Sequence, residues 1–151
     1  MNGRLPSPEQ VFRQMPCLCG VLHIAARCTA RLYSEEMRHT GLEITQNSML
    51  KVLSSLGPMT LGELGERICV DKTTASRNVK ILERNGWVAL ERGEDARERI
   101  VLLTREGEKK LASAHRAWER AQARMKAALP DGRFEALKQA LADLAVTTLQ
   151  A

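Results

Sequence analysis

The stretch DKTTASRNVKILERNGWV, residues 71–88, decides the fold of this chain. Asp71 is a favourable N-cap, because its side chain can accept a hydrogen bond from a free N–H group of the first helical turn. Gly86 stands where a helix commonly ends in the left-handed conformation. The segment therefore predicts one helix with well-defined ends, from about Lys72 to Asn85.

This helix divides into two kinds of face. Ala75, Val79 and Leu82 recur at helical spacing, which predicts a side packed against a core. The other faces carry Ser, Thr, Lys and Arg, the side chains that contact phosphates and base edges in the major groove of DNA. Their members are Lys72, Thr73, Ser76, Arg77, Lys80 and Arg84. Free N–H groups at the start of the helix would also suit a phosphate. The alternative is an ordinary solvated helix face.

The neighbouring segments place this helix in a known arrangement. Upstream, Thr45 is expected to cap a helix that ends at Gly57-Pro58. Thr60 and Glu63 form a capping-box pattern that opens a short helix to about Ile68. Downstream, the hydrophobic period changes to that of two strands, residues 87–91 and 98–103, joined by a polar turn. Three helices and a hairpin over residues 45–103 predict a winged helix-turn-helix.

The turn of the hairpin carries arginines, namely Arg92, Arg97 and Arg99. An arginine at the tip of a wing can enter a narrow, electronegative minor groove. Asp95 can orient the guanidinium of Arg97 through a charge-assisted pair. The alternative is a soluble turn with an exposed ion pair of little energetic weight.

Helices are also expected on both sides of the winged part. Residues 1–15 are interpreted as a flexible arm. Pro16 would be the first residue of a helix spanning 16–40, and residues 105–150 would form two helices separated by Pro130-Asp131-Gly132. Their regular apolar seams need a partner surface, which antiparallel packing or dimerisation would supply. The predicted fold class is thus mainly α with a small β-hairpin, in a single domain over residues 16–151.

Composition narrows the function classes. The 151 residues carry 23 basic and 18 acidic side chains, a net charge of +5 that suits a polyanionic partner. Aromatic residues make up 3%, too few for a base-stacking platform for single-stranded nucleic acid. We find no catalytic constellation, phosphate-binding glycine loop or cofactor motif, and so expect no enzyme and no cofactor. No signal peptide or membrane span is evident, which favours the cytoplasm.

At this point the sequence resembles a known family. Residues 71–88, the Asp95-Ala96-Arg97 wing and the Leu102–Gly107 stretch LLTREG are similar to those of the MarR family of transcriptional regulators. The resemblance implies an obligate homodimer that binds a pseudo-palindromic operator and acts in transcription, typically as a repressor. It implies that Arg97 enters the minor groove with Asp95 as its support. It further implies major-groove contacts from residues near Thr73, Thr74, Ser76, Arg77 and Lys80.

The start of the first long helix is a candidate effector site. Cys17 and Cys19 would lie in its first turn, where the helix dipole favours a thiolate, and His23 follows Cys19 by one turn. Aligning Tyr33 with a tyrosine of the OhrR-type peroxide sensors, a MarR subgroup, places Cys19 at their reactive cysteine and His23 at a second tyrosine. The alternatives are small core residues, for Cys19 and Cys28, or capture of a soft metal or arsenical by the C-x-C pair.

Other residues have simpler interpretations. His23, His39 and His115 could bind zinc only by converging across a dimer, so no metal site is expected. Trp118 and Met125 would belong to a dimer core or line a ligand pocket between the dimer helices and the winged part. Cys69 is expected to be buried.

We therefore expect a homodimeric DNA-binding regulator, switched by cysteine oxidation or by a small molecule. The alternative is a winged-helix module that binds an acidic protein and no DNA, since residues 58–105 carry a net charge of only +1. Strong salt dependence of binding would favour DNA.

Overall fold

The computed structural model describes residues 7–93, 95 and 98–150. Helices account for most of the chain, and three short strands form one sheet. The elements, in chain order, are α1 (Pro8–Gln14), α2 (Leu18–Met37), the 3-10 turn η1 (Arg38–Thr40), α3 (Ile44–Leu56), β1 (Met59–Thr60), α4 (Leu61–Arg67), α5 (Lys72–Arg84), β2 (Val88–Arg92), β3 (Arg99–Leu103), α6 (Arg105–Ala127) and α7 (Arg133–Leu149).

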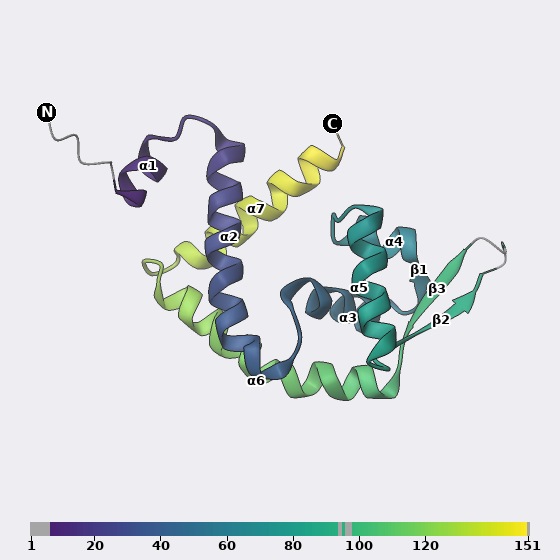
Figure 1. Ribbon diagram of the computed structural model, residues 1–151. Coiled ribbons are helices and arrows are strands. Elements are labelled where there is room, and N and C mark those ends of the chain that lie inside the picture. The colour runs from purple at the N-terminus through teal and green to yellow at the C-terminus, as the bar shows by residue number, and fades with distance from the viewer. Residues whose placement is uncertain (1–6, 94, 96–97, 151) are drawn as a thin grey trace, which may run out of the picture.

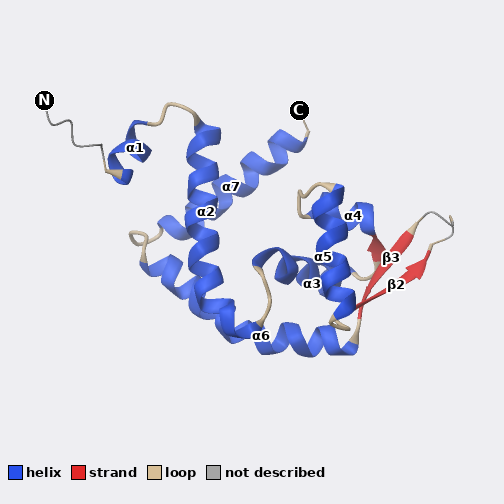
Figure 2. Cartoon of the chain, in the orientation of Figure 1, coloured by secondary structure: helices blue, strands red, loops and turns tan. Residues whose placement is uncertain are grey.

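Two lobes share one long helix (Figure 1). Helices α3, α4 and α5 and the sheet form the winged lobe, and α1, α2 and α7 form a helical lobe. Helix α6 starts beside the sheet, packs on α3 and then on α2, and so belongs to both lobes. Figure 2 shows the strands confined to one end of the molecule. This is a winged helix-turn-helix with flanking helices, as the sequence predicts.

The sheet has one strand more than the predicted hairpin. Its order is β1-β3-β2, and both pairings are antiparallel. Strand β1 has only two residues, of which Met59 pairs with Val101. A two-residue strand that follows Pro58 and includes the capping residue Thr60 is too short to produce an alternating pattern, so the sequence could not indicate it.

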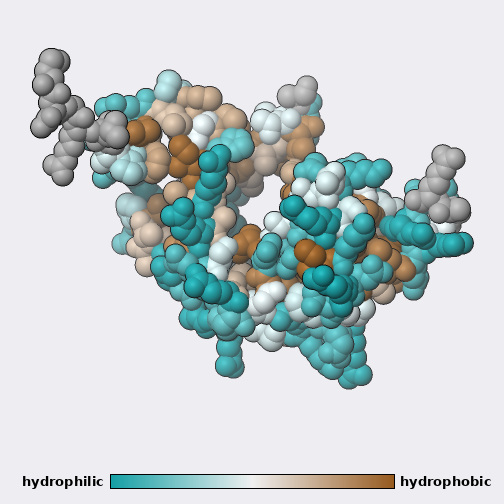
Figure 3. Space-filling view, in the orientation of Figure 1, coloured by the Kyte–Doolittle hydropathy of each residue, from teal (hydrophilic) through white to brown (hydrophobic). Residues whose placement is uncertain are grey.

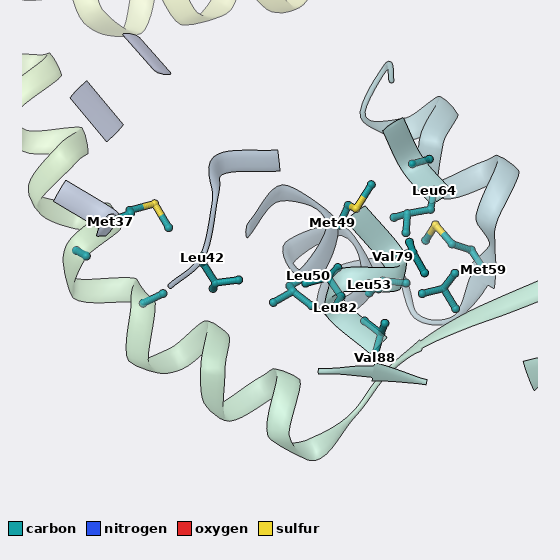
Figure 4. Close-up of a cluster of buried hydrophobic side chains, with 14 residues drawn as sticks. Met37, Leu42, Met49, Leu50, Leu53, Met59, Leu64, Val79, Leu82 and Val88 are labelled. Atoms are coloured by element: carbon teal, nitrogen blue, oxygen red, sulfur yellow. The ribbon is translucent and has the colours of Figure 1, made fainter. Parts of the chain in front are cut away.

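The hydrophobic core fills the winged lobe and extends along α6 (Figure 4). The apolar side of α5 is fully inside it, because Ala75, Val79 and Leu82 have at most 1% of their surface exposed. Helix α5 is therefore anchored by one side, and its remaining faces are free for contacts outside the molecule.

The join between the sheet and α6 depends on close backbone contact. Thr104 caps α6 by accepting the Gly107 N–H, and its hydroxyl donates to the Gly86 carbonyl at 2.6 Å. A Cβ on Gly107 would overlap the Trp87 carbonyl oxygen. Only glycine allows α6 to begin this close to the turn between α5 and β2.

An ion-pair cluster fastens α2 to α6. The Glu36 carboxylate accepts from Arg120 Nε at 3.2 Å and from an Arg124 guanidinium nitrogen at 2.8 Å. These hydrogen bonds from two cations hold the pKa of Glu36 below its usual value. The cluster joins residues more than 80 positions apart in sequence, so it could not be predicted from local patterns.

The N-terminal segment corrects two expectations. Part of the predicted arm is the helix α1, because Ser7 and Gln10 form a capping box and Pro8 follows the cap. Helix α2 begins at Leu18 with Cys17 as its N-cap, so Pro16 is not its first residue. Helix α1 buries none of its residues, so its sequence has no regular spacing of apolar residues that would predict a helix.

Helix α3 also begins earlier than expected. Its N-cap is Glu43 and not Thr45, and Glu43 and Gln46 cap each other reciprocally. Glu is an uncommon N-cap, whereas Thr is a common one, so the sequence favours Thr45 as the cap. Among the helices that the structure describes, none is both long enough and apolar enough to cross a membrane.

Candidate nucleic-acid interface

Helix α5 begins and ends where the sequence indicated. Asp71 Oδ1 accepts the Thr74 N–H at 2.8 Å, and the helix stops before Gly86, which adopts a positive φ of 72°. Hydrogen bonds from the Thr74 hydroxyl and from the Thr74 N–H to the ionised carboxylate lower the pKa of Asp71. Because the Asp71 carboxylate accepts the Thr74 N–H, a phosphate at this end of the helix would have to use other N–H groups of the first turn.

The outward side of α5 forms a shallow groove of about 600 Å³. Its cations Lys72, Arg77 and Lys80 are exposed, and within the described part of the chain none of them has an ion-pair partner. The groove-lining residues are Lys72, Thr73, Ser76, Arg77, Lys80 and Ile81. Five of these six were predicted. Ile81 was missed, although it stands one turn after Arg77.

Thr74 lies apart from this groove. Its hydroxyl donates to Asp71 Oδ2 at 2.7 Å, and its side chain is half-buried. The structure thus places the Thr74 hydroxyl in the helix cap, and the DNA contact that the family resemblance implies for Thr74 stays a prediction.

The wing, strands β2 and β3, presents two further cations. Arg92 and Arg99 are directly paired across the strands at the open end of the sheet, and both are exposed. Two like charges facing each other favour an anion beside them. The exposed Asp95 accepts the Glu98 N–H through its carbonyl at 2.9 Å. The prediction for Arg97 falls outside the described residues.

The predicted effector residues do not form one site within a chain. Cys17, Cys19 and His23 are exposed at the start of α2. Tyr33 lies ten residues after His23, about 15 Å along the helix axis. It is half-buried, and this burial raises the pKa of its hydroxyl. An arrangement of these groups like that of the OhrR-type sensors would require a second chain.

The cysteines contradict the core interpretation. Cys19, Cys28 and Cys69 are all exposed in the single chain. Cys69 was expected to be buried, but it occupies the turn between α4 and α5 with a φ of 53°. The Cys69 backbone forms the sharp turn, and its side chain is exposed, whereas Leu64 and Ala75 on either side of the turn are buried in the core.

The histidines and other large side chains are also dispersed. The described residues include no group of three or more His, Cys, Asp or Glu placed to hold a metal ion. His115 stacks on Trp118, whose ring lies 3.3 Å beneath Lys51 Nζ at the junction of α3 and α6. Met125 lines a separate pocket of about 270 Å³ with Tyr33 and Phe134. Trp118 and Met125 therefore do not share a pocket.

Two larger hollows flank α2. One, of about 830 Å³, is an apolar groove between α2 and α7 that Tyr33 borders. The other, of about 780 Å³, lies between the end of α2 and the start of α3, where Arg31 and Arg38 line it. Figure 3 shows hydrophobic side chains around α1 and the start of α2.

Comparison with known proteins agrees with this geometry. The MarR family profile matches residues 42–98. The Bacillus subtilis HTH-type transcriptional regulators YwoH and YcgE are 43% and 28% identical over 57% and 67% of this chain. These matches span 63% and 59% of the relatives' own length.

A solved structure matches over nearly its whole length. The transcriptional regulator MosR of Mycobacterium tuberculosis, solved in complex with DNA, is 32% identical with a TM-score of 0.74. The match covers 89% of this chain and 99% of that chain. With the fold, the family profile and this relative in agreement, the chain belongs to the MarR family of helix-turn-helix transcriptional regulators.

Proposed function

We propose that this protein binds duplex DNA as a homodimer, recognises a pseudo-palindromic operator and represses transcription from the promoter it occupies. The observation that carries the proposal is the groove on α5, with three exposed cations beside hydroxyl side chains on a helix anchored by its other face. That is the form in which a recognition helix enters a major groove. The MosR structure with DNA supports it, because that relative has the same fold.

The wing supplies the second contact. Arg92 and Arg99 give the hairpin an exposed pair of positive charges that would meet the phosphate backbone. Arg97, between them in sequence, would enter the adjacent minor groove with Asp95 as its support. Phosphate contacts of this kind fix the position of α5 on the duplex without reading its sequence.

A second copy of the chain would cover the helical lobe. The groove between α2 and α7 is lined almost wholly by apolar side chains, and Leu18, Leu137 and Leu141 on its walls remain exposed in the single chain. Val146 and Leu149, nearer the end of α7, are also exposed in the single chain. An apolar surface of this kind usually marks an interface. A two-fold dimer would present two α5 helices to two half-sites about one helical turn apart.

Cysteine oxidation is the proposed switch. Cys17 and Cys19 are exposed on either side of Leu18, which lines the apolar groove. A peroxide would oxidise one thiol to a sulfenic acid, and the second thiol or a partner's thiol would displace water to form a disulfide. The change at the edge of the dimer groove would alter the spacing of the two α5 helices.

A small acidic molecule in the crevice beside Arg31 and Arg38 is the other candidate effector. The crevice lies where the lobes meet, and its two arginines favour an anion. Glu35 and Glu43 on the same walls would limit the negative charge that it accepts.

The test is fluorescence anisotropy of the reduced protein on the DNA upstream of its own gene, across a series of salt concentrations. DNA binding through several phosphates predicts an affinity that falls steeply as salt rises. Adding stoichiometric peroxide should release the DNA, and dithiothreitol should restore binding. Cys19→Ser should bind normally and resist peroxide.

Each failure has a separate meaning. Absence of binding to any duplex, together with salt-independent capture of an acidic protein, would favour the interaction module. Equal binding before and after peroxide would remove the thiol switch and leave the crevice as the candidate effector site.

A further inference from the structure

The winged segment has few side chains that could identify adenine. Adenine is read in the major groove by the bidentate amide of Asn or Gln. Residues 58–105 include only two amide side chains, Asn78 and Asn85. Which bases α5 can recognise therefore depends on where these two amides lie.

Both amides are engaged within the protein. Asn78 is 5% exposed, and its Nδ2 donates to the Thr74 carbonyl at 3.0 Å. Asn85 is at the far end of the helix, where its Nδ2 donates to the Ile81 carbonyl at 2.8 Å. Neither lines the groove on α5. The adenine-reading side chain is thus absent from the surface that would face the bases.

The acid that could accept from cytosine at this end of the helix is also engaged. Asp71 uses Oδ1 on the Thr74 N–H and Oδ2 on the Thr74 hydroxyl. The carboxylate is thereby held against the first turn of the helix, and Asp71 is not among the residues that line the groove. The base contacts must come from the hydroxyl and cationic side chains of the groove.

Arg77 is the groove residue best shaped to identify a base. Its planar guanidinium matches guanine O6 and N7 with two parallel hydrogen bonds, whereas a lysine ammonium is a point charge suited to phosphate. Arg77 is exposed and has no ion-pair partner among the described residues, so its fork is available. Thr73, one turn before it, carries a methyl group that can contact thymine.

We propose that α5 reads guanine through Arg77 and makes no direct contact that identifies adenine. The inference rests on the proposed DNA binding and deepens it by naming the base class that each half-site must contain. Any preference for A·T pairs then comes from thymine methyl groups and from the minor groove beside the wing.

The test begins with selection of bound duplexes from a random library by the full-length protein. Guanines of the selected half-site are then replaced singly by 7-deazaguanine, which lacks the N7 acceptor. At one guanine per half-site we expect the affinity to fall about tenfold, as for loss of part of a bidentate contact. Inosine at the same position keeps N7 and O6 and should bind normally. Replacing adenines by 7-deazaadenine should have little effect.

Variants assign the contact to Arg77. Arg77→Ala should bind more weakly and should lose the 7-deazaguanine penalty, whereas Lys80→Ala should bind more weakly and keep it. Arg77→Gln supplies the missing amide, so selection with this variant should enrich adenine at the position that was guanine. The Gln variant decides the matter if the Ala variant binds too weakly to measure.

Contrary results separate the two proposals. A larger loss at an adenine than at any guanine, or a guanine penalty that persists in both Arg77 variants, overturns guanine reading while DNA binding stands. If the library yields no enriched sequence, sequence-specific DNA binding itself is overturned.

Discussion

At the scale of single residues, Gly107 shows how a small side chain fixes a junction. It is in the first turn of α6, and a Cβ there would meet the Trp87 carbonyl oxygen and a Leu103 methyl group. Both neighbours are held in place. The Trp87 carbonyl accepts the Thr104 N–H at 3.1 Å, and Leu103 pairs with Val88 in the sheet. The junction therefore tolerates no side chain at position 107.

Gly107→Ala should lower the free energy of unfolding by about 1–3 kcal/mol, the usual effect of overpacking a well-filled site. Gly62, in the first turn of α4, is the matched control, since a Cβ there meets only Thr60 Oγ1 at 3.9 Å. Gly62→Ala should be neutral or stabilising by up to about 1 kcal/mol. Chemical denaturation measures both, and equal effects of the two substitutions would contradict the steric account.

Asp71 should make stability depend on pH. Its folded pKa is lowered, so its contribution is complete above the unfolded value near 3.9 and is lost as pH falls through the folded pKa. The wild type should therefore begin to lose its advantage over Asp71→Asn below about pH 5 and should go on losing it as pH falls through the lowered folded pKa. Denaturation curves across that range measure the difference. A difference that stays constant with pH would show that the carboxylate charge does not stabilise the cap.

At the scale of elements, the contact between α2 and α6 is one that local sequence cannot indicate. Glu36 has only 19% of its side chain exposed and bonds to Arg120 and Arg124, whereas Glu35 is 48% exposed and lies 3.7 Å from Arg124. Of the two adjacent glutamates, Glu36 therefore makes the closer and less exposed ion pairs with α6.

Glu36→Gln should lower the melting temperature, because it leaves two arginines without a carboxylate between them. Glu35→Gln, the matched control, should change it little, since exposed and distant ion pairs contribute little. The loss in Glu36→Gln should shrink in high salt, which screens the wild-type pairs. Thermal unfolding, monitored by circular dichroism, distinguishes these outcomes. Similar melting temperatures for the two variants would show that the Glu36 ion pairs do not stabilise the contact between α2 and α6.

Elements with local signals were predictable from sequence. The capping box at Thr60 and Glu63, the Asp71 cap and the Gly86 stop are confirmed, and each acts within four residues of its partner. Strand β1 exists only because β3 offers it an edge, and α1 has no buried face to create a period. Strand β1 has no local signal at all, whereas the start of α1 has one, the capping-box pattern of Ser7 and Gln10 with Pro8 after the cap, but no apolar period accompanies it.

The candidate site follows the same division. The groove side chains of α5 were predictable because helical spacing alone sorts them from the buried side. The assignment of Thr74 to the cap, and of Asn78 to a backbone carbonyl, needed coordinates. The hollows beside Tyr33 join helices distant in sequence, so their lining could not be listed in advance.

At the scale of the whole molecule, the apolar groove between α2 and α7 predicts the assembly. Leu141, on the wall of that groove, should not tolerate a charge, because an unpaired buried carboxylate costs about 3–5 kcal/mol. Leu141→Glu should therefore yield a folded monomer at micromolar concentration. Leu56→Glu is the matched control, since Leu56 is an exposed leucine outside the groove.

Sedimentation velocity gives the oligomeric state, and circular dichroism confirms that both variants stay helical. The monomeric variant should also lose most of its affinity for a two-half-site duplex, since one α5 helix can contact only one half-site. A Leu141→Glu protein that remained dimeric would exclude this groove as the interface.

The shared helix α6 also sets how finely the molecule can be controlled. Its 23 residues span about 34 Å and run from the α2 clamp at one end to the sheet at the other. A rigid rod of that length, tilted by about 5° at one end, carries its other end through about 3 Å, close to the 3.4 Å rise between base pairs. A chemical change that tilts α6 slightly, without unfolding the helical lobe, would therefore displace the winged lobe by about the spacing of one base pair.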